Sequence, residues 1–440
     1  MGNVAAAERI DLERATLAEA TSQPDNGFDP TLLQSNGLVS RMTERLFRNP
    51  FAVMAFLRRY WPIPSLGNWT AITRFDDVAE AMQNDKAVAV PFGDKMKELA
   101  AGPNFVLGMA DSDGYQAMHD EIVAAFPRQD NHEIIAPFAY QEASRLVEEG
   151  NGRIDGVGGL LTLVPTLICE EYYGLKIEDK PGFARWTIAM SSYMFGDPTN
   201  KPDNKRAAQA GAALVRPIVD EAIDRAQAGG AKGTVVARFV QRQKEDPEAM
   251  PDNVIRAIML GMITGFVPTN TMASGHVLEL LLNKPDWLRQ AQDAAQAGDD
   301  NLLKGCLFEA MRFWPINPGP FRVVDEDFVI AAGTRREKLI KKGTNLIVST
   351  QSAMHDPSRV ENPREFNPNR KQTESMLMGF GLHWCIGAPL AYAQITQTFK
   401  ALLERNNLRR AKGPDGKMTT FGPFPENLWV LYDKSAAQPN

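Results

Sequence analysis

The sequence predicts a mainly helical fold with a small β-rich region near the N-terminus. Apolar residues recur at three- and four-residue steps through most of residues 114–230, which is the pattern of packed helices. A longer apolar pattern from Val254 to Leu282 predicts a central helix. The run from Trp69 to Phe75 is typical of a short strand, and a helical pattern from Asp76 to Gln83 follows it. These observations favour a large helical body beside one small sheet.

The remaining segments are assigned by the same periodicities. Residues 41–60 predict an amphipathic helix, and residues 88–110 predict a loop with scattered large apolar side chains. A further helix is expected from Ile386 to Arg405. The tail from Thr419 to Leu431 alternates and contains Gly422-Pro423, which predicts a hairpin.

Composition limits the partners and the location of the chain. A net charge of −6 over 440 residues argues against a nucleic-acid partner, which would favour a basic face. The three cysteines are widely spaced and form no disulfide framework, so a reducing cytoplasm is expected. Residues 1–30 lack the apolar core of a signal peptide, and the apolar stretch Phe51–Leu57 is too short to span a bilayer. We therefore expect a cytoplasmic protein without a membrane anchor.

The most informative residue is Cys385, which lies in the glycine-rich run Met378–Gly387. Glycines at 379, 381 and 387 are expected to let the backbone fold tightly around the sulfur, because only glycine takes φ > 0 without a steric cost. The helix predicted directly after it would point amides and its dipole near the sulfur and favour the thiolate. A lone thiolate held in this way suits a soft or borderline metal, above all a heme iron. The alternative is a simple buried thiol.

At these residues the sequence resembles the cytochrome P-450 superfamily, whose heme-binding signature is Phe-x-x-Gly-x-(Arg/His)-x-Cys-x-Gly. Gly381, His383, Cys385 and Gly387 stand at its fixed positions, and Met378 replaces the usual phenylalanine. The resemblance implies that heme b is the cofactor and that Cys385 ligates its iron. The flexible thioether of Met378 lacks a rigid π-face, so we expect an altered reduction potential.

Three further segments resemble the family in the right order. Glu309-Ala-Met-Arg312 is similar to the Glu-x-x-Arg pair, Lys342-Gly-Thr344 to the start of a family strand, and Phe366-Asn-Pro-Asn-Arg370 to the Phe-x-Pro-x-Arg segment. Four ordered matches are far more specific than any one of them. The resemblance implies that Glu309, Arg312 and Arg370 form a structural triad that holds the Cys385 loop. It also implies one P-450 domain over residues 41–440, after an N-terminal extension of residues 1–40.

The two heme propionates need cationic or hydrogen-bonding partners. Arg322 and His383 match family positions that serve them. In the family an earlier helix carries Asp-x-x-x-His-x-x-x-Arg, and here Tyr115 and His119 stand at the second and third positions after Asp111. Both substitutes can donate to a carboxylate. The alternative for this weaker match is an exposed helix face.

The oxygen side departs from the family pattern Ala-Gly-x-(Asp/Glu)-Thr-Thr. Aligned on Gly265, this chain reads Thr264-Gly-Phe-Val-Pro-Thr269, so Val267 and Pro268 stand where an acid and an alcohol relay protons. Pro268 also lacks an N–H and clashes with the carbonyl of Thr264, which predicts a broken turn. Thr264 and Thr269 remain as candidate hydroxyls for a proton relay. The alternative is a kinked packing segment without catalytic function.

The expected substrate is a hydrophobic small molecule, because the residues assigned to its pocket are apolar and carry few fixed charges. These residues are Phe92, Phe105, Val106, Met262, Phe266, Ile316 and Phe421.

Three activities are compatible with the sequence. The first is a monooxygenase that uses dioxygen and electrons from a ferredoxin-type partner. The second uses peroxide, either as a peroxygenase or by rearranging a fatty-acid hydroperoxide. The related fatty-acid peroxygenases also place proline beside this site, but next to an arginine that is Val267 here. The third is a heme-based gas sensor. The family as a whole favours the first activity and the local chemistry favours the second; we lean to the monooxygenase.

Overall fold

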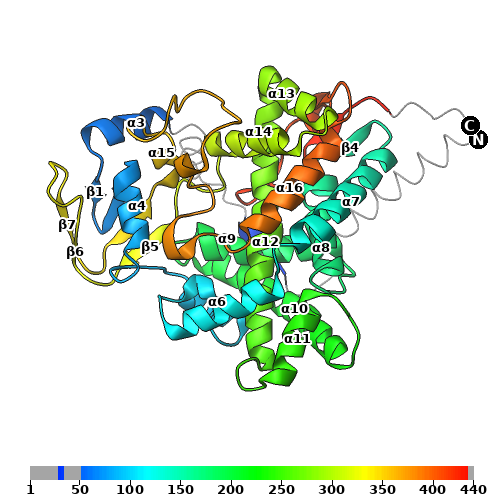
Figure 1. Cartoon of the computed structure of the whole chain (residues 1–440), viewed down its shortest axis with the longest axis horizontal. Helices are drawn as coiled ribbons and strands as arrows, with labels where there is room; N and C mark the ends of the chain where they lie inside the picture. The colour runs from blue at the N-terminus through cyan, green and yellow to red at the C-terminus, as the bar shows by residue number, and fades with distance from the viewer. Residues whose placement is uncertain (1–27, 34–50, 435–440) are drawn as a thin grey trace, which may run out of the picture.

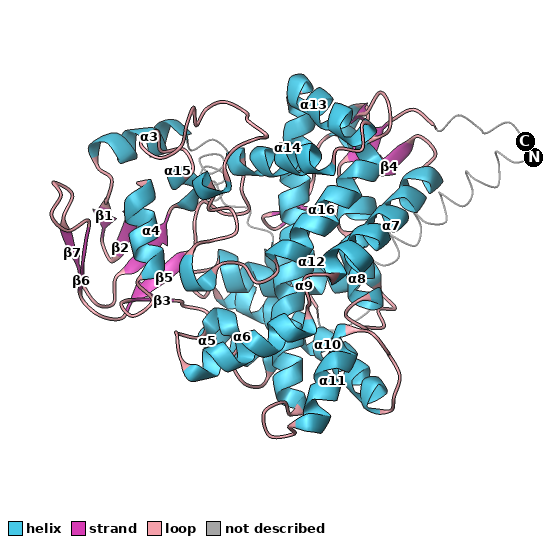
Figure 2. Cartoon of the chain, in the orientation of Figure 1, coloured by secondary structure: helices cyan, strands magenta, loops and turns pink. Residues whose placement is uncertain are grey.

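The computed structural model describes residues 28–33 and 51–434, and most of this part of the chain is helical, as predicted (Figure 1). The strands gather mainly on one flank, and the helices make up the rest (Figure 2). The longer helices, in chain order, are α3 (Phe51–Tyr60), α4 (Phe75–Gln83), α5 (Gly93–Ala100), α6 (Asp113–Ala125), α7 (Ala136–Glu149), α8 (Leu163–Glu171), α9 (Lys180–Gly196), α10 (Pro202–Gln227), α11 (Val235–Glu245), α12 (Asp252–Asn283), α13 (Pro285–Gln296), α14 (Asp300–Phe313) and α16 (Ala388–Leu403).

Short helical turns connect these helices. They are α15 (Thr350–Ala353), η1 (Pro30–Leu33), η2 (Val106–Gly108), η3 (Asn131–Ile135), η4 (Val157–Leu161), η5 (Gln372–Glu374), η6 (Gly381–His383) and η7 (Gly413–Gly416).

The main sheet lies on the flank beside α3 and α4 (Figure 2). Its strand order is β1-β2-β8-β5-β3, and only the β2–β8 pair is parallel. In that pair Trp69 lies opposite Asn345 and Ile72 opposite Val348. The strands are β1 (Ser65–Leu66), β2 (Trp69–Ile72), β3 (Val88–Ala89), β5 (Phe321–Val324) and β8 (Asn345–Val348). The sheet thus joins the N-terminal strands to the segment that leads towards Cys385.

The other strands form three small sheets. β6 (Phe328–Ile330) pairs with β7 (Lys338–Ile340), and β12 (Trp429–Leu431) lies between β4 (Arg153–Asp155) and β9 (Arg409–Arg410). β10 (Thr420–Phe421) and β11 (Phe424–Pro425) form the hairpin that the tail predicts. Gly422, at its turn, has φ +57°, which favours glycine.

Helix α12 runs through the middle of the helical body and forms much of its core (Figure 1). Among the described residues it is the one helix long and apolar enough to cross a membrane by length and composition, and 78% of its most apolar window is buried inside the protein. A helix that is apolar on all sides is expected where other helices surround it. The apolar residues of α12 are therefore part of the protein core.

Two predicted features differ from the structure. Residues 93–100, inside the predicted loop 88–110, form helix α5, because Met96, Leu99 and Ala100 bury one face against the core. Helix α12 continues unbroken through Pro268, contrary to the predicted break. Of the helix predicted over residues 41–60, residues 51–60 form α3, and residues 41–50 lie outside the described part of the chain. The same holds for most of the predicted extension 1–40.

Candidate functional site

The loop that carries Cys385 is a tight hairpin between η6 and α16. The backbone N–H of Cys385 donates to the carbonyl of Met378 over 2.7 Å. Gly379 and Gly381 have φ values of +82° and +71°, where a side chain would be strained. Gly387 has φ −83° and begins α16, so the expectation of a positive φ was wrong at this glycine. A Cβ there would lie 3.9 Å from Cys385 Sγ, an ordinary contact distance.

Gly381 also brings this loop against helix α4. A Cβ at Gly381 would lie 2.5 Å from the carbonyl oxygen of Met82, closer than real atoms approach. The loop therefore has a fixed position relative to α4 and the main sheet.

The thiol of Cys385 experiences two opposing effects. Burial raises its pKa, while hydrogen bonds from the backbone amides of Gly387 and Ala388 lower it, and burial has the larger effect. The amides expected at the start of the helix are therefore present, but they do not by themselves make a thiolate. A coordinated metal ion would deprotonate the thiol outright. Although protein surrounds the sulfur, Cys385 keeps an accessible surface.

Like Cys385, Gly265 keeps an accessible surface although its surroundings are buried. It is exposed although residues 261–264 and 266–268 of the same helix are buried, and a Cβ there would meet no atom within 4 Å. An exposed glycine in the middle of a buried helix indicates space for a bound group at this position.

A hollow of about 160 Å³ lies directly beside Cys385. Its wall combines residues that flank the cysteine with residues of α6, α12 and the end of α8, and most of them are apolar. They include Trp384, Ile386, Gly387, Met262, Ile122, Phe126 and Tyr172. His119, Arg128 and Asn131 add polar groups to the wall. The volume is below that of ordinary ligand pockets, so the hollow is one part of a cofactor site and not the whole of it.

Arg322 is a buried cation without an ion-pair partner among the described residues. It is 5% exposed, and its one hydrogen bond runs to the neighbouring carbonyl of Phe321. Burial lowers its pKa to about 10, and the nearby Asp85 carboxylate partly opposes this shift. Burial and the charge of Arg322 lower the pKa of His383 to about 4. A buried guanidinium needs an anion, and a heme propionate fits that need.

The structure brings Tyr115 and His119 to the same place as His383. The rings of Tyr115 and His119 stack at 5.9 Å, and the Tyr115 ring meets His383 edge-on at 5.8 Å. The Tyr115 hydroxyl donates to the carbonyl of Leu382 over 2.9 Å. The one hydroxyl proton of Tyr115 is therefore donated to the Cys385 loop. His119 Nδ1 lies 3.6 Å from Asp120 Oδ1.

Glu309, Arg312 and Arg370 form the ion-pair network that the resemblance implies. Arg312 donates from Nε and Nη2 to the two carboxylate oxygens over 2.9 and 2.7 Å, and Arg370 Nε donates to both over 3.1 Å. Their side chains are 2 to 6% exposed. Bidentate geometry makes such pairs strong and directional.

The same side chains hold the segment that leads to Cys385. Arg312 Nη1 donates to the carbonyls of Met354 and Pro363, and Arg370 Nη1 to that of Glu361. This part of the chain has little regular structure, so side-chain donors satisfy its backbone.

Three side chains that follow Pro268 bond to backbone carbonyls of helix α12. Thr269 Oγ1 donates to the carbonyl of Gly265 over 2.5 Å, Asn270 Nδ2 to that of Phe266 over 2.7 Å and Thr271 Oγ1 to that of Val267 over 2.9 Å. The carbonyl that Pro268 leaves without a backbone donor is that of Thr264, and none of these three bonds reaches it. The helix continues because the surrounding core packs against it. Thr264 is buried, at 2% exposed.

Six of the seven apolar residues assigned to a substrate pocket belong to, or pack against, one core cluster, and Phe421 lies in another. Phe105 packs on Gly261 of α12, where a Cβ would lie 2.6 Å from its ring, and Phe92 meets Phe195 edge-on. Phe266 stacks on Tyr173, and Met262 lines the hollow beside Cys385. Phe421 belongs to a separate cluster, while Val106 and Ile316 pack in the main core.

Sequence reasoning missed a buried network formed by Tyr172, Asp130 and Arg238. Tyr172 donates to Asp130 Oδ2 over 2.8 Å, and Arg238 Nη1 donates to the same oxygen over 2.6 Å. The three residues lie 42 and 66 positions apart in the chain, so local periodicity could not connect them.

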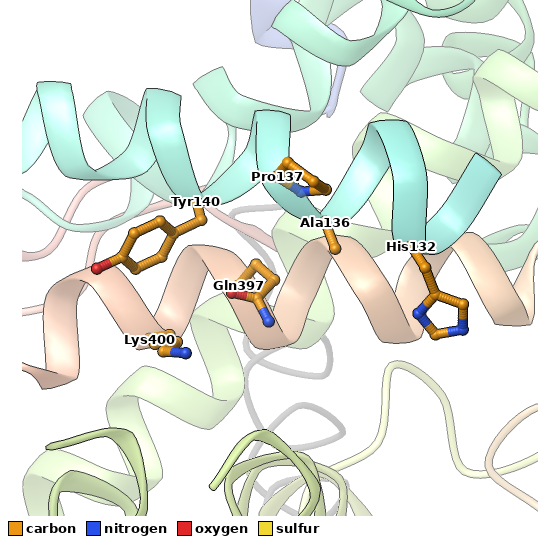
Figure 3. Close-up of a pocket in the computed structure, with 6 residues that line it drawn as sticks. All are labelled: His132, Ala136, Pro137, Tyr140, Gln397 and Lys400. Atoms are coloured by element: carbon orange, nitrogen blue, oxygen red, sulfur yellow. The ribbon is translucent and has the colours of Figure 1, made fainter. Parts of the chain in front are cut away.

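A second, shallow hollow lies on the outside, between η3–α7 and α16 (Figure 3). Its side chains include Tyr140, Gln397 and Lys400, which bond to Glu404 and Asp300. It lacks the buried polar groups of a cofactor site.

These features define a helical protein with an accessible cysteine directly before a helix, an open glycine on the central helix, and a buried arginine suited to a carboxylate. Residues 188–424 match the family described as Cytochrome P450. Cytochrome P450 107B1 of Saccharopolyspora erythraea is 26% identical over 394 residues, 85% of this chain and 91% of that protein.

Two further similarities are informative. The bifunctional dioxygenase–epoxy alcohol synthase of Pyricularia oryzae is 32% identical over 131 residues, 30% of this chain and 11% of that protein. The crystal structure of CYP109E1 from Bacillus megaterium, in complex with testosterone, has a TM-score of 0.74 at 17% identity, covering 88% of this chain and 99% of that one.

The site and these similarities place the protein in the heme-thiolate class of oxidoreductases. The chain belongs to the cytochrome P450 family, and heme b is its cofactor.

Proposed function

We propose that Cys385 ligates the heme iron and that the protein transfers an oxygen atom from a peroxide to a hydrophobic small molecule. Arg322 and His383 bind one propionate, and His119 contributes to the other. Tyr115 positions the Cys385 loop through Leu382, and Met378 and Gly387 pack beside the sulfur. When bound, the heme supplies the iron at which an O–O bond is broken and an oxygen atom is passed to carbon.

The observation that supports peroxide as the oxygen source is the lack of a free proton donor on α12 beside Gly265. Val267 and Pro268 offer no proton at the two relay positions, and the Thr269 hydroxyl donates to the Gly265 carbonyl over 2.5 Å. Breaking dioxygen requires two protons to reach its outer oxygen, whereas a peroxide already carries its proton and both electrons. A site without a relay therefore suits a peroxide.

A fatty-acid hydroperoxide is the proposed form of this peroxide. The Pyricularia oryzae protein, 32% identical over 131 residues, is named as a dioxygenase–epoxy alcohol synthase. In such a rearrangement the O–O bond breaks and both oxygens stay in one molecule, so no external electrons are needed. The apolar residues Phe92, Phe105 and Val106 pack near α12 and suit an acyl chain.

The second candidate is the dioxygen-dependent monooxygenase with a ferredoxin-type donor. It is favoured by the similarity to cytochrome P450 107B1 over 85% of the chain. In this case ordered water or the Thr264 hydroxyl carries the protons. For either candidate we propose a protein that works in the cytoplasm.

The two candidates are separated by supplying the heme-loaded protein with different oxidants. We expect product from linoleic acid hydroperoxide, or from hydrogen peroxide with linoleic acid. We expect little from linoleic acid with NADPH, a surrogate ferredoxin and its reductase. Product only with the electron-transfer proteins would remove the peroxide proposal.

Variants at Pro268 make the comparison sharper. Pro268→Thr restores an alcohol at the relay position and should gain dioxygen-dependent product, while Pro268→Ala removes the ring without adding a hydroxyl. Equal dioxygen-dependent activity in both variants would show that the missing alcohol does not decide the oxidant.

A further inference from the structure

A chain of buried aromatic rings leads away from Gly265. Phe266, the next residue on α12, stacks on Tyr173 with centroids 5.6 Å apart and planes at 26°. Tyr173 lies 6.0 Å from Tyr172, and Phe126 meets both tyrosines edge-on at 5.3 and 5.9 Å. We call Phe266, Tyr173 and Tyr172 the aromatic chain. Contact between rings along its whole length gives an electron a short path through the protein.

The two tyrosines of this chain differ in their hydroxyl groups. Tyr173 is fully buried, and its hydroxyl has no hydrogen-bond partner. Tyr172 is 4% exposed and donates to Asp130 Oδ2 over 2.8 Å. Only Tyr172 therefore has an acceptor for its proton at hydrogen-bond distance.

Asp130 is well placed to accept a proton. Its carboxylate is 5% exposed and also receives Arg238 Nη1 over 2.6 Å, while Arg238 donates as well to the carbonyl of Ala125. Burial and the Asp130 carboxylate raise the pKa of Tyr172 well above its ordinary value. The phenol thus stays neutral at ordinary pH, and it can lose its proton when an electron leaves at the same time.

Tyr172 also lines the hollow that Trp384 and Gly387, the neighbours of Cys385 in the chain, border. The aromatic chain thus reaches from the residue after Gly265 to the wall of this hollow.

We propose that Tyr172 is a redox-active residue that supplies an electron to the heme centre when peroxide has oxidised it and no substrate is bound, with Asp130 taking the proton. Hydrogen peroxide is the oxidant: a bound heme would take two oxidising equivalents from it as the O–O bond breaks and water leaves. Tyr172 loses one electron through the aromatic chain and its O–H bond breaks. The proton joins the Asp130 carboxylate, a neutral tyrosyl radical remains, and the centre is one electron short.

This inference goes beyond the proposed function, because it concerns the fate of an oxidised centre without substrate. A neutral phenol must release its proton on oxidation, and a buried positive charge would otherwise be costly. The carboxylate beside Tyr172 removes that cost. Oxidation of Tyr172 thereby removes oxidising equivalents from the porphyrin and from Cys385.

The test is electron paramagnetic resonance of the heme-loaded protein, frozen rapidly after hydrogen peroxide is added without substrate. We expect an organic radical signal whose hyperfine pattern changes when the tyrosines are ring-deuterated. Tyr172→Phe keeps the ring and should lose this signal. No tyrosyl signal in the native protein, or an unchanged signal in Tyr172→Phe, would overturn the proposal.

Two matched control variants test whether loss of the radical signal is specific to the Tyr172 hydroxyl. Tyr173→Phe removes a hydroxyl without a partner, leaves the ring path and should keep the signal. Tyr140→Phe removes a hydroxyl that also donates to a carboxylate, Glu404 over 2.8 Å, at the outer hollow (Figure 3), and should keep it too. Loss of the signal in Tyr173→Phe with retention in Tyr172→Phe would place the radical elsewhere and refute the assignment.

Heme loss is checked by the absorption band of the reduced carbon monoxide complex, which should match in all variants. We also expect faster bleaching of the heme by peroxide in Tyr172→Phe than in Tyr173→Phe. Equal bleaching rates would contradict the protective role. None of these measurements needs a substrate or a product, so they stand apart from the test of the proposed function.

Discussion

At the scale of single residues, buried charges explain how the Cys385 loop is held. Glu309 is the one carboxylate that both Arg312 and Arg370 share, and the backbone N–H of Asn367 also donates to it over 3.1 Å. Removing a buried charge from such a network leaves its partners uncompensated. Breaking an exposed ion pair lowers the free energy of unfolding far less, because water replaces the missing partner.

We therefore expect Glu309→Gln to lower the free energy of unfolding by about 3–5 kcal/mol. The variant should also retain less heme, because the loop is no longer fixed. The matched control is Glu326→Gln, which breaks an exposed pair with Lys86 at 3.4 Å and should cost under about 1 kcal/mol. Chemical denaturation checks both, and equal losses would contradict the structural role of the triad.

His355 makes the free energy of unfolding depend on pH. It is 5% exposed, and burial together with the charge of Arg312 lowers its pKa to about 3. Below its ordinary pKa of 6.5 the unfolded chain takes up a proton that the folded protein does not. Stability therefore falls as the pH is lowered from about 6.5 to about 3.

We expect His355→Gln to remove this contribution, because the amide can keep the bond to the Gln351 carbonyl without titrating. Denaturation at a series of pH values should show a shallower acid loss in the variant than in the native protein. Parallel curves would mean that His355 does not carry the effect.

At the scale of elements, one loop and one helix show how local strain is accommodated. The hairpin of Cys385 needs positive φ at Gly379 and Gly381, and helix α12 continues through Pro268 although the proline offers no N–H to the Thr264 carbonyl. The sequence predicted the hairpin because glycine has a direct conformational meaning. It did not predict the continuous helix, because the core that packs around the helix is not visible in the local pattern.

Gly381→Ala should displace the hairpin, since the new Cβ would lie 2.5 Å from the Met82 carbonyl. We expect strong loss of heme retention, measured by the heme-to-protein absorbance ratio. Gly343→Ala is the matched control: its φ is +84°, but no atom lies within 4 Å of the added carbon. The control carries the same backbone strain, so similar heme loss in both variants would argue against the close approach as the cause.

Prediction of elements succeeded where a pattern is long and failed where it is short. The central helix was expected over residues 254–282 and is observed at Asp252–Asn283, and the strand at Trp69 is observed at Trp69–Ile72. Helix α5 has eight residues and only one buried face, and the signal of Met96, Leu99 and Ala100 is too short to distinguish from a loop. Its form depends on the core that it covers.

At the scale of the whole molecule, α5 joins the helical layers above the N-terminal half of α12. Lys95 Nζ donates to the carbonyls of Tyr193 and Asp197 over 2.7 and 2.5 Å, at the C-terminal end of α9. Arg216 of α10 donates to the carbonyl of Leu99 over 3.0 Å. Cations are favourable at a helix C-terminus, where carbonyls lack partners. The longer helices α9 and α10 are thereby linked through the short helix α5.

Lys95→Met removes the two hydrogen bonds between α5 and the end of α9 and should make both segments more mobile. We expect faster amide hydrogen exchange in both segments and faster binding of hydrophobic compounds to the heme-loaded protein. Lys97→Met is the control, because that side chain is 56% exposed and lies 3.9 Å from Asp94. Unchanged exchange in Lys95→Met would show that the link does not hold α5 in place.

The sequence by itself determined the helical class, the cofactor and the residues of the Cys385 loop and the triad as candidates, because these depend on periodicity and on short motifs with fixed chemistry. The tertiary structure alone decided which residues are neighbours: Tyr172 lies beside Asp130, Gly381 against Met82, and Phe421 in a cluster separate from the main core. Contacts between distant segments arise from packing, and packing depends on the shape of the whole core.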